Sequence, residues 1–180
     1  MADAPDAPAT AGTPGTPTAP DLENAVRDTL AAGILGKGAH ADSDTILDGL
    51  AWELAGRDVP GSPYTILQNA NHIIYWNGYA TAHLAGLRPP PPAHAVDGWP
   101  GPKAVGSATE WDAFVVAYKA SLAALALAAR TGAPNALVVS RTRLDVVRAM
   151  LQHVSYHAGQ IALLRRMLGA WPPPGGGDTW

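Results

Sequence analysis

Cysteine is absent from the 180-residue chain. Its absence excludes disulfide bonds, iron–sulfur clusters, thiolate zinc sites and cysteine nucleophiles. A metal ion bound by this chain must therefore take its ligands from histidine, carboxylate, carbonyl or water. For the same reason, any thiol that reacts at such an ion must come from outside the chain.

Charged residues are scarce, at 15% of the sequence, where about 25% is usual for soluble domains. The formal net charge of −3 indicates no basic surface, so we expect no nucleic-acid partner. The most apolar stretch, Phe114–Ala129, contains Lys119 and is shorter than the roughly 20 residues that span a membrane. The N-terminus also lacks the basic and apolar regions of a secretory signal. We therefore expect a cytoplasmic protein without a membrane partner.

The 17 prolines are unevenly placed and divide the chain. Residues 1–20 are rich in Ala, Pro and Thr and have no large apolar residue except Met1. This composition predicts a disordered tail, followed by one helical domain over residues 21–180. A second proline-rich segment, ending near Gly106, predicts a long loop of the kind that often contacts a ligand or a partner.

Apolar residues recur at helical spacing through the rest of the chain, and the apolar run Leu137–Val139 is too short to predict a strand. Capping residues and glycines indicate where the helices begin and end. The expected helices span Asp21–Leu35, Ser43–Leu54, Ser62–Leu87, Ser107–Arg130 and Arg143–Leu168. Asp21, Ser62, Ser107 and Thr142 are the expected N-caps. The sequence thus predicts an all-α fold, a four-helix bundle with one extra short helix.

His153 and His157 lie four residues apart in the last expected helix, so their rings share one face about 6 Å apart along the axis. This arrangement lets two imidazoles bind one metal ion. The glutamate of an HExxH metalloprotease motif is missing, because Val154 follows His153. A third ligand should come from another helix, where His72 and His83 are the candidates. Only one of them can reach the ion, since they lie about 16 Å apart along their helix, and the apolar surroundings of His72 favour it.

Other polar residues have structural interpretations. His40 and His94 lie near Gly and Pro and are expected in loops. Ser155 has no evident Asp–His relay, so we do not expect it to be a nucleophile. Arg165 and Arg166 are expected to face solvent or an ion-pair partner.

The run from Gln152 to Pro174, with its Tyr-His-x-Gly-Gln-Ile-x-x-Leu-Arg-Arg motif, resembles the C-terminal signature of the DinB/YfiT-like superfamily. The segment Ser62–His72 resembles its upstream histidine segment, and Leu35–Ala41 resembles a glycine-rich turn of some members. The resemblance implies a four-helix DinB-like bundle, often a homodimer, in which three histidines hold a divalent metal ion. Carried onto this sequence, the metal ligands are His72, His153 and His157.

The resemblance implies nickel or zinc as the metal cofactor, with iron or manganese as alternatives. It also implies an enzyme that binds a low-molecular-weight thiol at the metal ion and either transfers that thiol to a substrate or uses it to isomerise one. A metal-dependent hydrolase of small molecules is a second hypothesis. A non-catalytic metal-bearing stress-response or binding protein is a third.

Gln160 lies three residues after His157, on or beside the face of the paired histidines. It is the one candidate for a catalytic side chain, because it could orient a bound water, or it could simply satisfy a ligand. Four tryptophans could serve a dimer interface or equally the core: Trp99, Trp111, Trp171 and Trp180.

Overall fold

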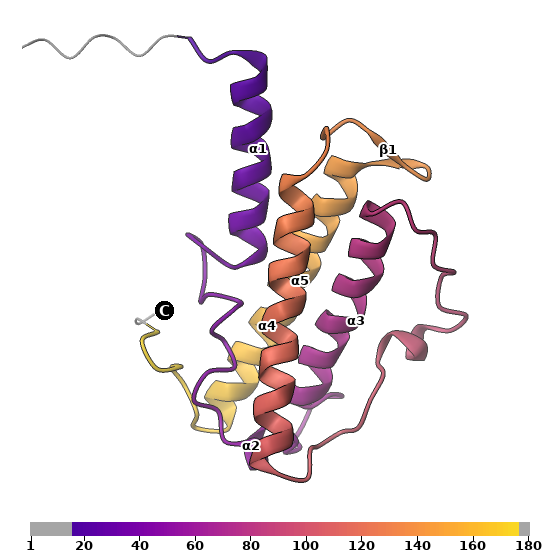
Figure 1. Cartoon of the computed structure of the whole chain (residues 1–180). Helices are drawn as coiled ribbons and strands as arrows, with labels where there is room; N and C mark the ends of the chain where they lie inside the picture. Colours follow the sequence, from indigo (N-terminus) through magenta and orange to yellow (C-terminus); the bar gives the residue numbers. More distant parts are fainter. Residues whose placement is uncertain (1–15, 177–180) are drawn as a thin grey trace, which may run out of the picture.

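The computed structural model describes residues 16–176 of the chain. In this part of the chain, four long helices form the bundle in Figure 1: α1 (Ala19–Ile34), α3 (Ile66–Leu84), α4 (Ala108–Arg130) and α5 (Arg143–Met167). Helices α1 and α3 each pack against both α4 and α5, so α1 and α3 occupy opposite corners of the bundle. The predicted all-α, four-helix bundle is confirmed.

Helix α1 begins two residues before the predicted start. Its N-cap is Thr18, whose hydroxyl accepts a hydrogen bond from the Asp21 N–H, while the Asp21 carboxylate accepts one from the Thr18 N–H at 2.9 Å. This reciprocal capping box satisfies two backbone donors that the first turn leaves free. The tail predicted over residues 1–20 falls largely on residues 1–15, which lie outside the described residues, and its last two residues belong to α1.

The N-cap of α3 also differs from the prediction. Thr65 caps the helix instead of Ser62, because Thr65 and Gln68 each satisfy the backbone N–H of the other. This choice starts the helix later but keeps His72 well inside it. The caps predicted for α4 and α5, Ser107 and Thr142, are confirmed.

The helix predicted over Ser43–Leu54 is wrong. Residues 43–49 form successive turns, and only the short α2 (Trp52–Ala55) is helical. Gly49 has a φ of 65°, which ends any helix there, and a Cβ on it would lie 2.6 Å from Pro174 Cγ. The apolar residues Ile46, Leu47 and Leu50 are nevertheless buried. Their spacing marked core residues correctly, but turns and not a helix bring them inward.

Arg165 explains much of this local structure, and the expectation that it faces solvent is wrong. Its side chain is only 1% exposed. The guanidinium donates to the carbonyls of Ile46, of Asp48 at 3.0 Å and of Ala170 at 2.9 Å. Carbonyls that accept from Arg165 need no helical N–H partner, so the 43–49 turns are satisfied by a residue of α5.

A small hairpin that was not predicted joins α4 to α5. Its strands, β1 (Leu137–Val138) and β2 (Arg141–Thr142), pair antiparallel. Two residues per strand are too few for an alternating pattern to show in the sequence. The other long connection, between α3 and α4, is the proline-rich loop, which runs along the outside of α3 and contains the one-turn helix η1 (Ala95–Gly98) (Figure 1).

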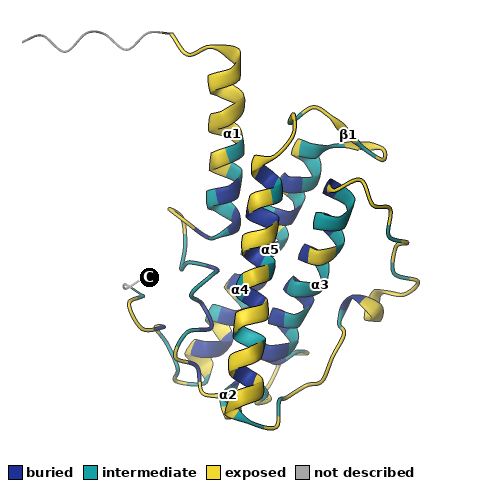
Figure 2. Ribbon diagram, in the orientation of Figure 1, coloured by how far each residue is buried: buried dark blue, intermediate teal, exposed yellow. Residues whose placement is uncertain are grey.

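Helix α4 is long and apolar enough to cross a membrane, by length and composition alone. The helix has 23 residues and is longer than the apolar run Phe114–Ala129, whose short length argued against a membrane span in the sequence. In the bundle, however, Tyr118, Leu122 and Leu125 of α4 are fully buried, while Figure 2 shows exposed residues along its outer side. A core helix of a water-soluble bundle passes the same test, so the span is weak evidence for a membrane.

Candidate metal centre

Three histidines converge between α3 and α5. His72 comes from α3, and His153 and His157 come from successive turns of α5. One ring nitrogen of each lies within 4.8 Å of the other two, a grouping that could hold a metal ion. His72 and His157 are buried and His153 is half-buried. The structure therefore brings together the three histidines that the sequence singled out, and His83 lies outside the group.

The ring of His72 is oriented by the proline-rich loop. Its Nδ1 is hydrogen-bonded to the Gly98 carbonyl. A carbonyl can only accept, so Nδ1 carries the hydrogen and Nε2 presents a lone pair to the other histidines. The same ring stacks on Trp99, with centroids 3.8 Å apart, and the other face of Trp99 stacks on Tyr64 at 3.6 Å. The loop thus both orients His72 and covers it.

Two hydrogen bonds attach the proline-rich loop to the start of α3. The Asn71 side-chain amide donates to the Pro100 carbonyl, and the Thr65 hydroxyl donates to the Lys103 carbonyl at 2.9 Å. Because Thr65 also caps α3, this one residue both starts the helix and binds the loop that covers His72. The sequence did not predict that Gly98 and Trp99 contact His72, because no pattern in it indicates that the loop packs against α3.

Asn69 orients His157, and the sequence did not identify it. Its Oδ1 lies 3.2 Å from His157 Nδ1, while its amide nitrogen donates to the Thr65 carbonyl at 2.9 Å. With the amide nitrogen engaged, the oxygen faces His157, so Nδ1 of that ring donates and Nε2 keeps its lone pair. The signal that could have found Asn69 is its place three residues before His72, on the same face of α3.

The spacing and donor set of the three rings fit a divalent ion. His72 Nε2 lies 3.1 Å from His153 Nε2. Two imidazole nitrogens bound to one zinc ion at about 2.0–2.1 Å with tetrahedral angles are roughly 3.3 Å apart. Carbonyl and amide oxygens behind two of the rings are the outer partners that metal-binding histidines usually have. His153 Nδ1, by contrast, is buried without a hydrogen-bond partner within residues 16–176.

All three histidines have pKa values below the ordinary 6.5. Burial, followed by the charges of His157 and His72, lowers the pKa of His153 to about 4. Burial and the charge of His72 lower that of His157 to about 4, with the Gln160 side chain acting in the opposite direction. Burial also lowers the pKa of His72, opposed by the Gly98 carbonyl. The rings are therefore neutral at pH 7, which is the form that binds metal.

Gln160 lies where the sequence predicted, beside His157. Its Oε1 is buried and makes no hydrogen bond of acceptable geometry within residues 16–176, although the side chain lies close enough to His157 to raise the pKa of that ring. The residue lines a cavity of about 300 Å³ together with Asn69, Tyr64 and Leu163. A buried carbonyl oxygen of this kind usually has a water or a ligand as its partner. Its role in catalysis stays a prediction.

The remaining histidines have structural places. His40 Nε2 accepts from the Ser155 hydroxyl at 3.1 Å, and His40 Nδ1 donates to the Ala41 carbonyl at 2.8 Å. This pair joins the turn after α1 to α5. His94 precedes η1 in a loop, as predicted. His83 is half-buried, with its ring centroid 4.6 Å from that of Tyr79 in an edge contact.

The tryptophans separate by environment. Trp111 is a core residue, 4% exposed, and donates to the Leu50 carbonyl at 2.9 Å. Trp99 covers His72, as described above. Trp171 is half-buried with the guanidinium of Arg166 at 4.8 Å from its ring, and Arg166 itself is exposed, as predicted. Trp180 lies outside the described residues.

A family model described as the DinB superfamily matches residues 37–161, more than half of the chain. The match begins just after α1 and ends in α5, shortly after His157, so it includes all three histidines of the cluster. No curated protein and no solved structure matches the chain.

Proposed function

The chain belongs to the DinB superfamily, and from that premise we propose that His72, His153 and His157 hold one divalent metal ion. Family membership and the three-histidine cluster both fit a metal-binding protein. Nickel or zinc is the proposed ion, with iron or manganese as alternatives, because imidazole suits all of these metals. The lowered pKa values support the proposal, since neutral rings need not lose protons to bind.

We further propose that the site belongs to a thiol-transferring or thiol-dependent isomerising enzyme with a small-molecule substrate. Three neutral ligands leave the charge of a divalent ion uncompensated, and such an ion would lower the pKa of an added thiol or polarise a carbonyl group. In a transfer, the S–H bond of the thiol would break and its proton would pass to solvent. The thiolate would then form a carbon–sulfur bond at the electrophile, whose leaving group would depart with the electron pair of the bond that breaks. The thiol must be an external, low-molecular-weight compound, because the chain has no cysteine.

One observation favours thiol chemistry over hydrolysis. None of the groups that shift the pKa values of the three histidines is a carboxylate. Water attack is ordinarily assisted by a general base beside the site, and within residues 16–176 no Asp or Glu shifts the pKa of these rings. A thiol needs less assistance, because its ordinary pKa of about 8.5 is already near neutrality.

The chain's own residues would then have defined tasks. Gly98 and Asn69 orient the rings of His72 and His157 through their Nδ1–H groups. Trp99 and Tyr64 exclude water from one side of His72 by stacking. Gln160 would accept a hydrogen bond at its unpartnered Oε1 from a ligand in the adjacent cavity.

The same unpartnered oxygen supports a hydrolase as the second candidate. Gln160 Oε1 could accept a hydrogen bond from a water and orient it toward a bound ester or amide. Hydrolysis would then depend on both the metal and Gln160. A metal-bearing stress-response or binding protein without turnover is the remaining outcome, and it would show metal binding with neither activity.

Titration of a thiol into the cobalt-substituted protein tests the proposal. A thiolate-to-cobalt charge-transfer band is expected in the wild type and should be absent in His157→Ala. His83→Ala is the matched control, since it removes a histidine outside the cluster. No band under saturating thiol, together with ester turnover that is lost in His153→Ala and Gln160→Ala, would favour the hydrolase.

The proposal also includes a cytoplasmic location, no nucleic-acid or membrane partner, and a homodimer. The net charge of −3 supports the lack of a nucleic-acid partner. The homodimer rests on the resemblance alone, and light scattering coupled to size-exclusion chromatography would show whether the mass in solution is twice the 18.6 kDa of one chain.

A further inference from the structure

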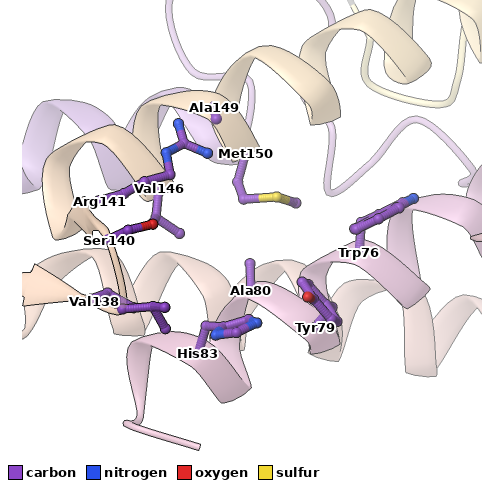
Figure 3. A pocket seen from close by; sticks show the side chains of 11 residues that line it. Trp76, Tyr79, Ala80, His83, Val138, Ser140, Arg141, Val146, Ala149 and Met150 are labelled. Carbon is purple, nitrogen blue, oxygen red and sulfur yellow. The ribbon is translucent and has the colours of Figure 1, made fainter. Parts of the chain in front are cut away.

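A second cavity, of about 310 Å³, lies between α3, α5 and the hairpin (Figure 3). This volume is at the lower end of the roughly 300–1,000 Å³ of small-molecule sites. Most of its lining is apolar and comes from all three elements: Trp76, Tyr79, Ala80, Val138, Val146, Ala149 and Met150. Neither His72 nor His153 nor His157 lines it.

Arg141, on β2, is the only fully charged side chain of the lining. In Figure 3 its guanidinium lies on the α5 side of the cavity, opposite His83 on α3. One of its N–H groups donates to the backbone carbonyl of Asp145 at 3.1 Å. No carboxylate lies within ion-pair distance of Arg141 in the part of the chain that the structure describes. Arg141 is exposed, so its remaining donors contact water and are available to an anion.

The nearest acidic side chain, that of Asp145, has other partners. Its carboxylate accepts from the Thr142 hydroxyl at 2.8 Å and pairs with Arg148 at 3.5 Å. These hydrogen bonds, and only then the charges of Arg148 and Arg141, hold the pKa of Asp145 below its usual value. Asp145 thus caps α5 and pairs with Arg148, and its charge attracts Arg141 without forming an ion pair with it.

We propose that this cavity binds a small organic acid with an apolar body. The carboxylate would meet the guanidinium of Arg141, and the body would lie against Ala80, Val146 and Met150. An arginine presents paired N–H groups that match a carboxylate. A polar body would lose hydrogen bonds to water on entering an apolar cavity, while a neutral apolar molecule would gain nothing from the charge of Arg141. The lining therefore selects for both halves of such a ligand.

Trp76 is the wall between this cavity and the three histidines. Its ring centroid lies 6.2 Å from those of His72 and of His153, in edge contact with both. Met150 lies one turn before His153 on the opposite wall. A ligand in the cavity would therefore lie beside the cluster, separated from it by one indole. The binding of this acid does not depend on the proposed function.

Calorimetric titration of the full chain with two acids, octanoate and phenylbutyrate, and with the matching alcohols tests the assignment. At least one acid should bind, and its alcohol should bind about tenfold more weakly because it lacks the charge. Arg141→Gln should reduce affinity for the acid by a similar factor and leave that for the alcohol unchanged. Arg57→Gln is the matched control, since it removes an exposed arginine that does not line the cavity.

A second variant tests the apolar half of the site. Ala149→Phe should abolish binding of acid and alcohol alike by filling the cavity, with a melting temperature close to that of the wild type, since Ala149 is only half-buried. Failure of both acids to bind the wild type, equal binding by Arg141→Gln, or unchanged binding by Ala149→Phe would each overturn the assignment.

A variant that lacks two histidines of the cluster distinguishes the acid-binding proposal from the metal-binding proposal. In the double variant His153→Ala, His157→Ala, acid binding should persist, because neither histidine lines the cavity. Loss of acid binding there would show that the ligand sits on the histidines, which contradicts the assignment. Absence of metal from the wild type, with acid binding retained, would overturn the proposed function alone.

Discussion

The Nε2 atoms of His72 and His153 lie 3.1 Å apart, although 81 positions separate the two residues in the chain. The hydrogen bond of His72 to Gly98 leaves the lone pair of His72 directed at this contact. Because His72 Nε2 carries no hydrogen, His153 Nε2 donates this hydrogen bond in the metal-free chain, and a bound ion would take the place of that hydrogen. The consequences of such a contact for stability, pH and affinity can be measured.

Metal should stabilise the folded protein. An ion that binds only the folded state contributes about 2.7 kcal/mol at a concentration 100 times its Kd, which corresponds to roughly 5–10 °C in Tm for a chain of this size. Calorimetric scans with nickel or zinc, and after chelation, would measure the shift. His157→Ala should lose it and His83→Ala should keep it; an equal shift in both variants would place the ion elsewhere.

The metal-free protein should lose stability on acidification. The pKa values of His153 and His157 are about 4 in the folded state, against about 6.5 in an unfolded chain. Between these values the unfolded state binds more protons, so stability is full above pH 6.5 and falls as pH drops toward 4. Urea midpoints at pH 7.5, 6 and 5 would show the decline. The double variant His153→Gln, His157→Gln should give a flatter profile, and a decline as steep as that of the wild type would contradict this origin.

Asn69→Ala should weaken metal binding without removing a ligand. Loss of the oxygen that orients His157 is expected to reduce metal affinity by about 10–100-fold, as for other outer partners of histidine ligands. Competition with a coloured chelator would measure the affinity. Asn135→Ala, in the exposed turn before β1, is the control and should bind like the wild type. Equal affinities in the two variants would argue against a role for Asn69.

Arg165→Ala should be strongly destabilising. The substitution leaves the carbonyls of Ile46, Asp48 and Ala170 without their donor, and a loss of about 3 kcal/mol is expected from charged hydrogen bonds in a buried setting. Chemical unfolding gives the free energy directly. Arg148→Ala, which removes an exposed side chain of the same helix, should change stability by no more than about 0.5 kcal/mol. A loss confined to that range for Arg165→Ala as well would refute the crosslinking role.

Much of the bundle could be predicted from local signals. The first residues of α4 and α5 could be predicted from Ser107 and Thr142, because a capping hydroxyl acts on backbone donors only two or three residues away. The pairing of His153 with His157 follows equally from helix geometry. His72 was harder, since its choice over His83 depended on the apolar residues around it and on resemblance.

Other parts of the structure had no local signal. The Ser43–Leu54 segment has a helical apolar pattern, but its carbonyls are bound by a guanidinium more than 100 residues away. Arg165 itself looks like a surface residue of an amphipathic helix. Its burial is possible only because turns from another part of the chain present two carbonyls to it, those of Ile46 and Asp48. Such partners are decided when the helices pack, and no window of sequence contains both.

The sequence alone determined that the protein is helical, that it has no thiol of its own, and that two imidazoles share one face of its last long helix. These properties depend on composition and on spacings of a few residues, which backbone geometry converts directly into structure. Only the tertiary structure decided which loop covers His72, that Asn69 orients His157, and that a cavity lined by Arg141 lies beyond Trp76. Those relationships join residues that are distant in the chain, and they exist only once α3, α5 and the hairpin have packed together.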